Sequence, residues 1–418
     1  MKRLFIGGVV ALVFLSTAVS ASAQSGTTTT TPATTAGPAT AKPPTTGAPG
    51  VTATSIKVAG VGYALLYGGA DVGAKARFQR ANDTGGVNGR TINYAGFADD
   101  GGNPAVTTAL ATALVQQQAV FAVVPAVTGN FTASSYLVQQ KVPYFGWALS
   151  SSFCGTRYGF GFNGCQVPKG VTSNSWPILI AKLIGATAAG RAVAILAENT
   201  PTGQYEVTSL TAAAQSAKFK VVYGKATLDV PATVDYDGAA KAVLTSNAGK
   251  SPDIVFVVGG PSNVLGMQLA LAANGFLGVF TNEIEYAPDL VAPAIGAQVM
   301  TQTAPTESAP TNPAMAQLVK DVQKVAPDQP INQAVIAGYW SADLFLAAVK
   351  KAGKNLTTAS LVKAANNNFT YRVPNTVGPT TFPAAHSLPT PCGALVASDG
   401  TVYAVKVPYS CARIIPVK

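Results

Sequence analysis

Few residues in this sequence have the types and spacing that catalysis or metal binding would need. The single histidine, His386, lies in a proline-rich stretch, where we predict an exposed loop residue. One histidine excludes histidine-rich metal sites and most His-based catalytic triads. Residues 68–73 lack the second glycine of a dinucleotide-binding fingerprint, and the chain has neither a Gly-x-Ser-x-Gly elbow nor a Gly-x-x-x-x-Gly-Lys-[Ser/Thr] phosphate loop. The sequence therefore predicts a protein that is not an enzyme and that holds no metal and no cofactor.

Length and charge narrow the remaining classes of protein. At about 100–200 residues per domain, 418 residues predict two or three folded units. The formal net charge is +10, but only 11% of the residues are charged, against about 25% in typical proteins. No segment combines clustered Lys and Arg with interleaved aromatic residues, as contacts to phosphates would require. We therefore expect no nucleic-acid partner.

The first 54 residues predict export followed by a spacer. Lys2 and Arg3 precede an apolar run, and Ala21-Ser22-Ala23 provides the small residues of a cleavage site, so we predict a signal peptide over residues 1–23. No cysteine closely follows that run, so no acceptor for a bacterial lipid anchor is present. Residues 24–54 are rich in Thr and Pro and poor in large apolar side chains, which predicts a disordered spacer. We expect a secreted or extracytoplasmic protein in a periplasm or cell envelope.

Four cysteines in an exported chain predict two disulfides. Of the three possible connectivities we favour nearest-neighbour pairing, which joins Cys154 to Cys165 and Cys392 to Cys411. Loops this short would contribute about 3 kcal/mol each, mainly through the unfolded state. Neither pair has the Cys-x-x-Cys spacing of a redox-active site.

From residue 55 onward, short β-branched runs alternate with helical patterns. The clearest helix begins at Asn103-Pro104, an N-cap followed by a first-turn proline. The predicted strands are 56–61, 91–97, 121–125, 144–149, 193–197, 220–223, 254–258 and 279–281, with further strand-like sequence at 394–407. The predicted helices are 74–81, 103–114, 131–140, 176–184, 203–217, 238–246, 263–274, 313–325 and 334–351. Repeated β-α units with continuously apolar strands predict parallel sheets covered by helices on both faces. There are too many β-α units for one sheet, and residues 167–175 form a polar break, so we predict two doubly wound lobes.

This succession of elements resembles the type I periplasmic-binding-protein fold. The resemblance is specifically to the extracytoplasmic solute-binding proteins of ABC transporters related to the Leu/Ile/Val-binding protein, and it covers residues 55–418. It is carried by Ile56-Lys57-Val58-Ala59-Gly60, Tyr67-Gly68, the segment Asn82-Asp83-Thr84-Gly85-Gly86-Val87-Asn88-Gly89-Arg90, Asp99-Asp100 with Asn103-Pro104, Lys141-Val142-Pro143-Tyr144, and Pro252-Asp253-Ile254-Val255-Phe256 followed by Gly259-Gly260.

The resemblance implies an α/β fold with two Rossmann-like lobes, three hinge crossings and a cleft between the lobes. Lobe one would combine residues 55–170 with 302–372, and lobe two would combine 171–301 with 373–418. Three connections allow the lobes to open and close without unfolding either core.

The resemblance also implies where a ligand would lie. Members of this kind hold a carboxylate with hydroxyls and backbone N–H groups at a helix start, which concentrates unpaired donors. The matching loops are residues 126–130, with Thr128 and Asn130, and 148–151, with Ala148 and Ser150. Either hydroxyl could instead only cap the following turn.

Glu283 would meet an ammonium group, with Glu198 as second choice, while Asp99 and Asp100 are expected to fix a turn. Aromatic residues would line the pocket, namely Tyr67, Tyr63, Trp147 and Tyr205.

Two departures from the family pattern concern the ligand. The bulky Trp147 stands where a small residue or proline is common, and Thr202-Gly203 replaces a Tyr-Gly pair. Both argue against simple leucine binding, although Trp147 and Tyr63 could equally be core residues.

We therefore predict a solute-binding protein that captures a small amino-acid-like or organic-acid ligand for ABC-transporter uptake. An ABC permease is the expected partner, and we expect a monomer. The alternative is the same fold acting as a secreted envelope sensor or scaffold that is not coupled to transport. A hydrolase is the third function considered, and none of the catalytic motifs considered above supports it.

Overall fold

The protein is described by a computed structural model over residues 47–185, 188–230 and 234–417. Within these residues the first sheet is parallel, with strand order β2-β1-β3-β4-β5. Its strands are β1 (Ser55–Gly62), β2 (Thr91–Asp99), β3 (Ala122–Val127), β4 (Tyr144–Gly146) and β5 (Gly159–Gly161). The central strand β3 is buried at every position, so both faces of the sheet need cover.

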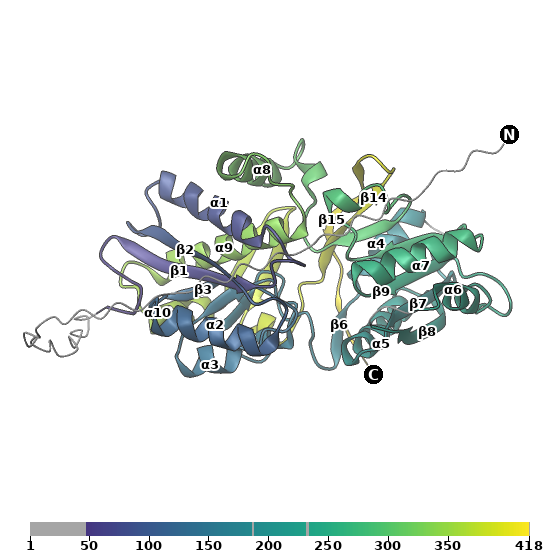
Figure 1. The fold of residues 1–418 in the computed structure, drawn as a ribbon, viewed down its shortest axis with the longest axis horizontal. Coiled ribbons are helices and arrows are strands. Elements are labelled where there is room, and N and C mark those ends of the chain that lie inside the picture. The colour runs from purple at the N-terminus through teal and green to yellow at the C-terminus, as the bar shows by residue number, and fades with distance from the viewer. Residues whose placement is uncertain (1–46, 186–187, 231–233, 418) are drawn as a thin grey trace, which may run out of the picture. The chain divides into compact units, whose positions relative to one another are not determined.

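Helices cover both faces of the first sheet. Helices α2 (Pro104–Gln116) and α3 (Ser134–Gln139) pack on one face. Helices α1 (Ala70–Asp83) and α9 (Gln333–Ala352) pack on the other, where Phe345 of α9 contacts the rings of Phe78, Phe121 and Phe145. Helix α8 (Pro313–Val325) packs against α1, and α10 (Thr358–Ala365) packs against α9. This lobe thus combines two segments that are distant in the sequence (Figure 1).

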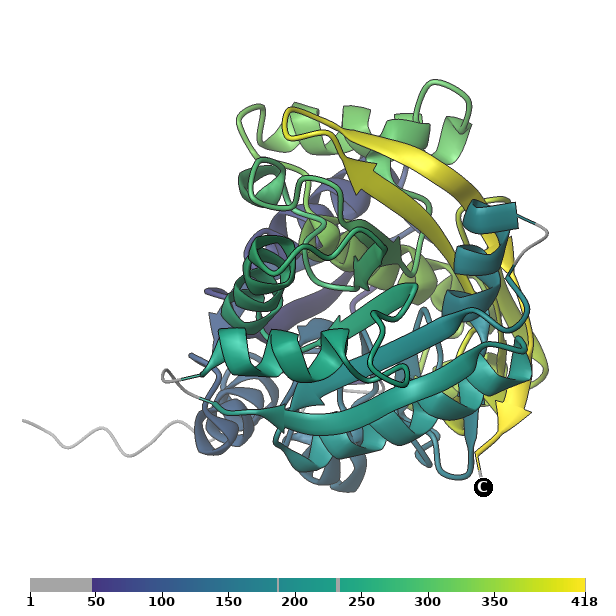
Figure 2. The same cartoon turned by 90° about the vertical axis from the view of Figure 1, so that its right-hand side faces the viewer.

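The second sheet has the strand order β15-β14-β11-β10-β9-β7-β8. Its strands are β7 (Ala192–Glu198), β8 (Lys220–Leu228), β9 (Ile254–Val258), β10 (Val279–Asn282), β11 (Gln298–Thr301), β14 (Cys392–Ser398) and β15 (Tyr403–Cys411). The strands from β8 to β11 are parallel, and β14 and β15 are antiparallel to their neighbours. In Figure 2 these two yellow strands run along one edge of the sheet.

Helices also cover both faces of the second sheet. Helices α4 (Ser175–Ile184) and α5 (Pro201–Ser216) share one core with the sheet, and α6 (Tyr236–Leu244) and α7 (Pro261–Ala273) share another. The predicted α/β fold with two lobes is therefore confirmed. The predicted parallel pairing of strands is confirmed for the β-α units, whereas the C-terminal hairpin of β14 and β15 is antiparallel.

The chain passes between the lobes three times, as predicted. It leaves the first sheet after β5, returns after β11 through the short helix η4 (Thr306–Ser308), and enters the second sheet again at β14. The strand β6 (Val171–Ser173) in the first crossing pairs with β16 (Ile414–Pro416) near the end of the chain. The hairpin of β12 (Phe369–Val373) and β13 (Val377–Phe382) spans the predicted boundary at 372/373 and precedes η5 (Ala384–His386), which contacts β5.

Both disulfides form with the predicted nearest-neighbour pairing. Cys154 is bonded to Cys165 beside the short helix η1 (Ser151–Phe153), and Cys392 is bonded to Cys411 across the β14–β15 hairpin.

The predicted signal peptide and the spacer up to residue 46 lie outside the described residues. The last part of the predicted spacer lies against lobe one, where Lys57 donates its backbone N–H to the carbonyl of Gly50 and Val51 packs on the core. Among the helices that the structure describes, none is long and apolar enough to span a membrane.

Candidate functional site

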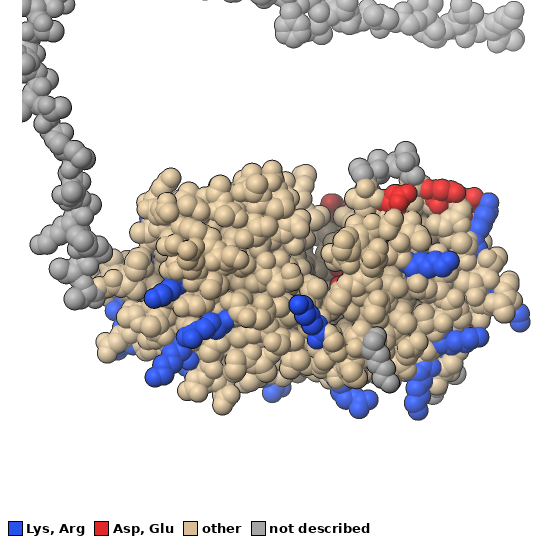
Figure 3. All heavy atoms as spheres, turned by 90° about the horizontal axis from the view of Figure 1, so that it is seen from below, with Lys and Arg blue, Asp and Glu red and all other residues tan. Residues whose placement is uncertain are grey.

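A cavity of about 200 Å³ lies between the two lobes. Loops that follow β1 and β4, with the start of α9, provide one wall, and helix α5 with the ends of β9, β10 and β11 provides the other. Doubly wound sheets bind ligands at such strand ends. Figure 3 shows a hollow between the two halves of the molecule, with acidic side-chain atoms visible in it. The lining residues are Tyr67, Trp147, Leu149, Thr202, Glu206, Leu210, Phe256, Val257, Val258, Gly259, Glu283, Ile284, Met300, Gln302 and Gln333.

Two aromatic residues contribute to the lobe-one wall. Tyr67 and Trp147 meet edge to face, with ring centroids 6.0 Å apart. Burial, with a smaller contribution from the Asp100 carboxylate, raises the pKa of Tyr67 to about 12, so its hydroxyl is a neutral donor at physiological pH. Trp147 Nε1 donates to Gln302 Oε1 at 2.8 Å. The indole is thereby fixed at the bottom of the cleft.

Gln302 ties the first crossing to the second. Its Oε1 also accepts from Asn163 Nδ2 at 2.5 Å, and its Nε2 donates to Gln166 Oε1 at 3.3 Å. One amide side chain therefore holds three partners that lie more than 130 residues away in the sequence.

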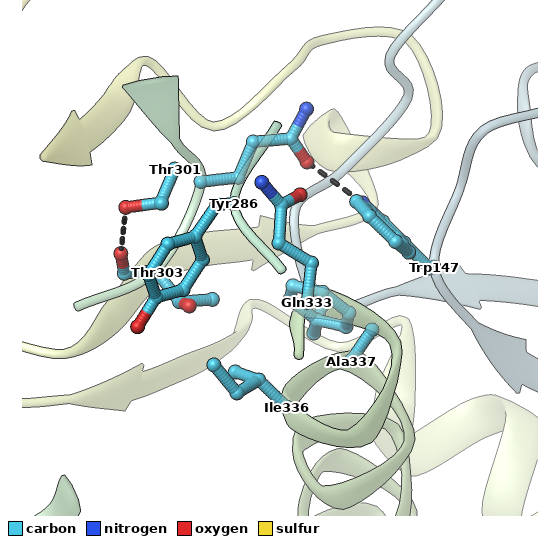
Figure 4. Close-up of a pocket in the computed structure, with 9 residues that line it drawn as sticks. Trp147, Tyr286, Thr301, Thr303, Gln333, Ile336 and Ala337 are labelled. Carbon is cyan, nitrogen blue, oxygen red and sulfur yellow. Dashed lines mark hydrogen bonds between the residues drawn. The ribbon is translucent and has the colours of Figure 1, made fainter. Parts of the chain in front are cut away.

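A smaller cavity of about 10 Å³ adjoins this amide network. In Figure 4, Trp147 and Gln333 face one another at the start of α9, and Thr301, Thr303 and Tyr286 lie on the opposite side. Trp147, Gln302 and Gln333 line both cavities.

Two carboxylates, those of Glu206 and Glu283, belong to the lobe-two wall. Glu206 lies on α5 and is half-buried; burial first, and then the charge of Glu283, raise its pKa to about 8. Glu283 follows β10, lines the cavity and is exposed. Removal from bulk water raises its pKa to about 7. Within residues 47–185, 188–230 and 234–417, neither carboxylate has a hydrogen-bond or ion-pair partner.

The structure places three of the predicted ligand contacts, Tyr67, Trp147 and Glu283, on the same cavity. Tyr205 lies beside it, and its hydroxyl donates to the carbonyl of Pro168 at 2.9 Å in the first crossing. Its neighbour Glu206 lines the cavity instead. Tyr205 as a ligand contact stays a prediction.

The predicted carboxylate anchors lie outside the lining of this cavity. Thr128 is buried and its hydroxyl lies 3.5 Å from the backbone nitrogen of the exposed Asn130. Ser150 caps η1 by accepting from the backbone of Ser152, and the backbone N–H of Ala148 donates to Asn163 Oδ1 at 3.3 Å. The Thr128 and Ser150 hydroxyls therefore serve local turns, and the Ala148 N–H joins its loop to the first crossing. Ligand contacts from these four residues stay predictions.

Two other predicted acids have structural roles. The second-choice Glu198 accepts from the backbone N–H of Gly260 at 2.7 Å and from Asn263 Nδ2 at 2.9 Å, which fixes the start of α7. Asp99 accepts from the backbone of Ala64 and Gly101, so it stabilises a turn as expected.

The prediction that His386 is an exposed loop residue is wrong. Its side chain is buried in η5 between the rings of Phe160 and Phe382, and Nε2 lies 2.7 Å from Asn366 Oδ1. Burial lowers its pKa to about 4. The proline-rich sequence suggested exposure, whereas the β12–β13 hairpin folds this segment onto lobe one. Among the described residues, no group of acidic, histidine and cysteine side chains is arranged to hold a metal ion.

Sequence reasoning missed Glu206, Gln302 and Gln333. A signal for Glu206 existed, because Thr202, Glu206 and Leu210 are spaced by four and so share one face of α5. No pattern marked Gln302 or Gln333, since an isolated amide in a crossing or at a helix start has no distinctive spacing.

Comparison with known families gives a match over most of the chain. The sequence model of the family described as periplasmic binding protein matches residues 59–401. The chain belongs to this family. A comparison with curated proteins gives no match.

Solved structures share the fold of this periplasmic binding protein at low sequence identity. A fatty acid ABC transporter substrate-binding protein from Thermomonospora curvata has a TM-score of 0.66 at 18% identity, covering 88% of this chain and 95% of that one. A branched-chain amino acid transporter substrate-binding protein from Streptococcus pneumoniae, in complex with isoleucine, has 0.64 at 17%, covering 85% and 100%. A solute-binding protein from R. palustris in complex with benzoate has 0.63 at 16%, covering 86% and 98%.

Periplasmic binding proteins bind substrates and are not enzymes. The chain is accordingly a ligand-binding protein of this family, and the solved structures, all under 25% identical, show that its fold is shared.

Proposed function

We propose that this periplasmic binding protein captures a small solute with an amino group in the interlobe cavity and presents it to an ABC permease. One observation carries this proposal: two carboxylates that have no partner among the residues that the structure describes share a cavity whose other walls are mostly apolar and aromatic. Unpaired charge in such surroundings is costly, and a cationic group on the ligand would offset that cost.

Three related structures frame the choice of ligand. By their descriptions, they bind or transport fatty acid, isoleucine and benzoate, which are all apolar bodies with a polar end. Amino-acid-like ligands fit the acidic wall better than plain organic acids, because their ammonium group can pair with Glu206 and Glu283, whereas a plain organic acid has no group that pairs with either glutamate. A ligand that touches both walls would stabilise the closed arrangement of the lobes, so the closed population would rise with occupancy.

Two measurements test this function. Isothermal titration calorimetry against amines, amino acids and organic acids should find at least one binder, and mass spectrometry should identify a solute that copurifies. If the whole panel fails to bind and nothing copurifies, the solute-capture function is refuted.

A further inference from the structure

The acidic wall differs in kind from the opposite wall. Glu206 on α5 and Glu283 after β10 line the same cavity and repel one another. Lys and Arg are absent from the residues that line this cavity in the described part of the chain. Once ionised, the pair is a region of negative potential, which a positive charge placed near both carboxylates would neutralise.

The rest of the lining is suited to an apolar body. Leu149, Leu210, Phe256, Ile284 and Met300 contribute aliphatic or aromatic surface, and the Tyr67 and Trp147 rings close the lobe-one side. The cavity volume of about 200 Å³ lies below the ~300–1,000 Å³ typical of pockets for drug-sized ligands. The space suits a ligand with one charged end and a short apolar or aromatic body.

The lining that the structure describes holds no cationic side chain for a second, anionic end, and its hydroxyl donors are those of Tyr67 and Thr202, which are neutral. The lining amides belong to Gln302 and Gln333, and the Oε1 and Nε2 of Gln302 are already engaged. Gln333 Nε2 donates to the backbone carbonyl of Glu283 at 3.2 Å. The hydroxyls of Thr128 and Ser150 lie outside the lining. A free carboxylate would therefore face two acidic side chains without a cationic partner of its own.

We propose that the cleft selects small primary amines, whose ammonium group is held jointly by Glu206 and Glu283, and that it does not require a carboxylate on the ligand. This inference rests on the proposed solute-binding function and names the ligand class. Each ammonium group offers three donors, which is enough to serve both carboxylates at once.

Matched probes separate the two ends of the ligand. One series shares a branched body: leucine carries both charged groups, isoamylamine carries only the ammonium, and 4-methylpentanoate carries only the carboxylate. Phenylalanine, phenethylamine and 3-phenylpropionate form the same series on an aromatic body. By calorimetry we expect the tighter-binding of the two amines to bind at least as tightly as the amino acid of the same series. We expect the two acids to bind at least ~10-fold more weakly than that amine.

Contrary outcomes are separable from failure of the proposed function. Tighter binding of the amino acid than of its amine by 10-fold or more, or binding of an acid alone, overturns the amine assignment and leaves solute capture standing. Absence of binding by all six probes also overturns the assignment, whereas solute capture is refuted only if no solute copurifies as well.

Isosteric variants test the role of the pair. Glu206→Gln and Glu283→Gln should each weaken amine binding by ~10-fold or more, because each removes a charge-assisted hydrogen bond. Asp237→Asn is the matched control, since Asp237 is an exposed acid on α6 of the same lobe, paired with Lys241. The control should bind amine like the wild type, and thermal melting should show that all three variants are folded. Unchanged affinity in both glutamate variants would overturn the assignment.

The pH dependence gives a second readout. The titratable side chains on the cavity are Tyr67 from lobe one and the two glutamates from lobe two, and the Glu198 carboxylate adjoins it near Gly259. Tyr67 stays neutral throughout, whereas raising the pH from 5.5 to 8.5 ionises the pair, so amine affinity should rise by ~10-fold or more while the amine itself remains charged. The double variant should lose this rise. A flat wild-type profile would contradict joint binding by the two carboxylates.

Discussion

Replacing Gln302 by leucine should destabilise the protein through the bottom of the cleft. The substitution preserves approximate size and removes the acceptor of two donors, Trp147 Nε1 and Asn163 Nδ2. Both residues are buried, with 9% and 3% of their surfaces exposed, so water reaches the freed donors poorly. Each unsatisfied buried donor costs about 1–3 kcal/mol. We expect Gln302→Leu to lower the free energy of unfolding by about 2–4 kcal/mol.

Urea denaturation followed by fluorescence measures this loss. Trp147→Phe is the matched variant, because it removes one donor and leaves the Asn163 bond to Gln302 in place. It should cost less than Gln302→Leu, by about 1 kcal/mol or more. The remaining tryptophans, Trp176 and Trp340, are buried and report unfolding in both variants. A loss below about 0.5 kcal/mol for Gln302→Leu would refute the reasoning that this amide holds the crossings together.

Two further predictions concern titration of the unliganded protein. Burial lowers the pKa of His386 to about 4, so NMR should show a neutral imidazole at pH 5. The stability that the neutral imidazole contributes is lost as the pH falls below about 6.5. A titration midpoint of His386 near pH 6.5 would contradict its burial. Folding raises the pKa values of Glu206 and Glu283 to about 8 and about 7. The protonated glutamates therefore contribute their full stabilisation below the ordinary pKa of a glutamate, and this contribution is lost as the pH rises through 7–8. Thermal melts between pH 5 and 9 should show this decline in the wild type and a smaller one in Glu206→Gln; equal slopes would count against the raised pKa.

Much of the fold follows from local sequence signals. The helix predicted at 313–325 has the observed bounds of α8, because Asn312 caps it and Pro313 occupies the first turn. The Asn103 cap likewise fixes the start of α2. The antiparallel edge of the second sheet carried no comparable signal, since the pairing of β14 with β11 joins segments that lie far apart in the sequence.

The candidate site was less predictable than the fold. Tyr67, Trp147 and Glu283 could be named because the family resemblance placed ligand contacts there, and the structure has all three after strands whose ends gather at the cleft. Gln302 acts through partners in another crossing, so its role depends on how the two lobes are connected. The burial of His386 depends on the same kind of long-range packing, here between η5 and the Phe160 ring.

A crystal structure with the tightest-binding solute of the calorimetric panel tests the central claim most directly. We predict electron density for that solute between Trp147 and the Glu206–Glu283 pair, in contact with both lobes. Density at a site outside this cavity, or contacts with one lobe alone, would contradict capture between the lobes.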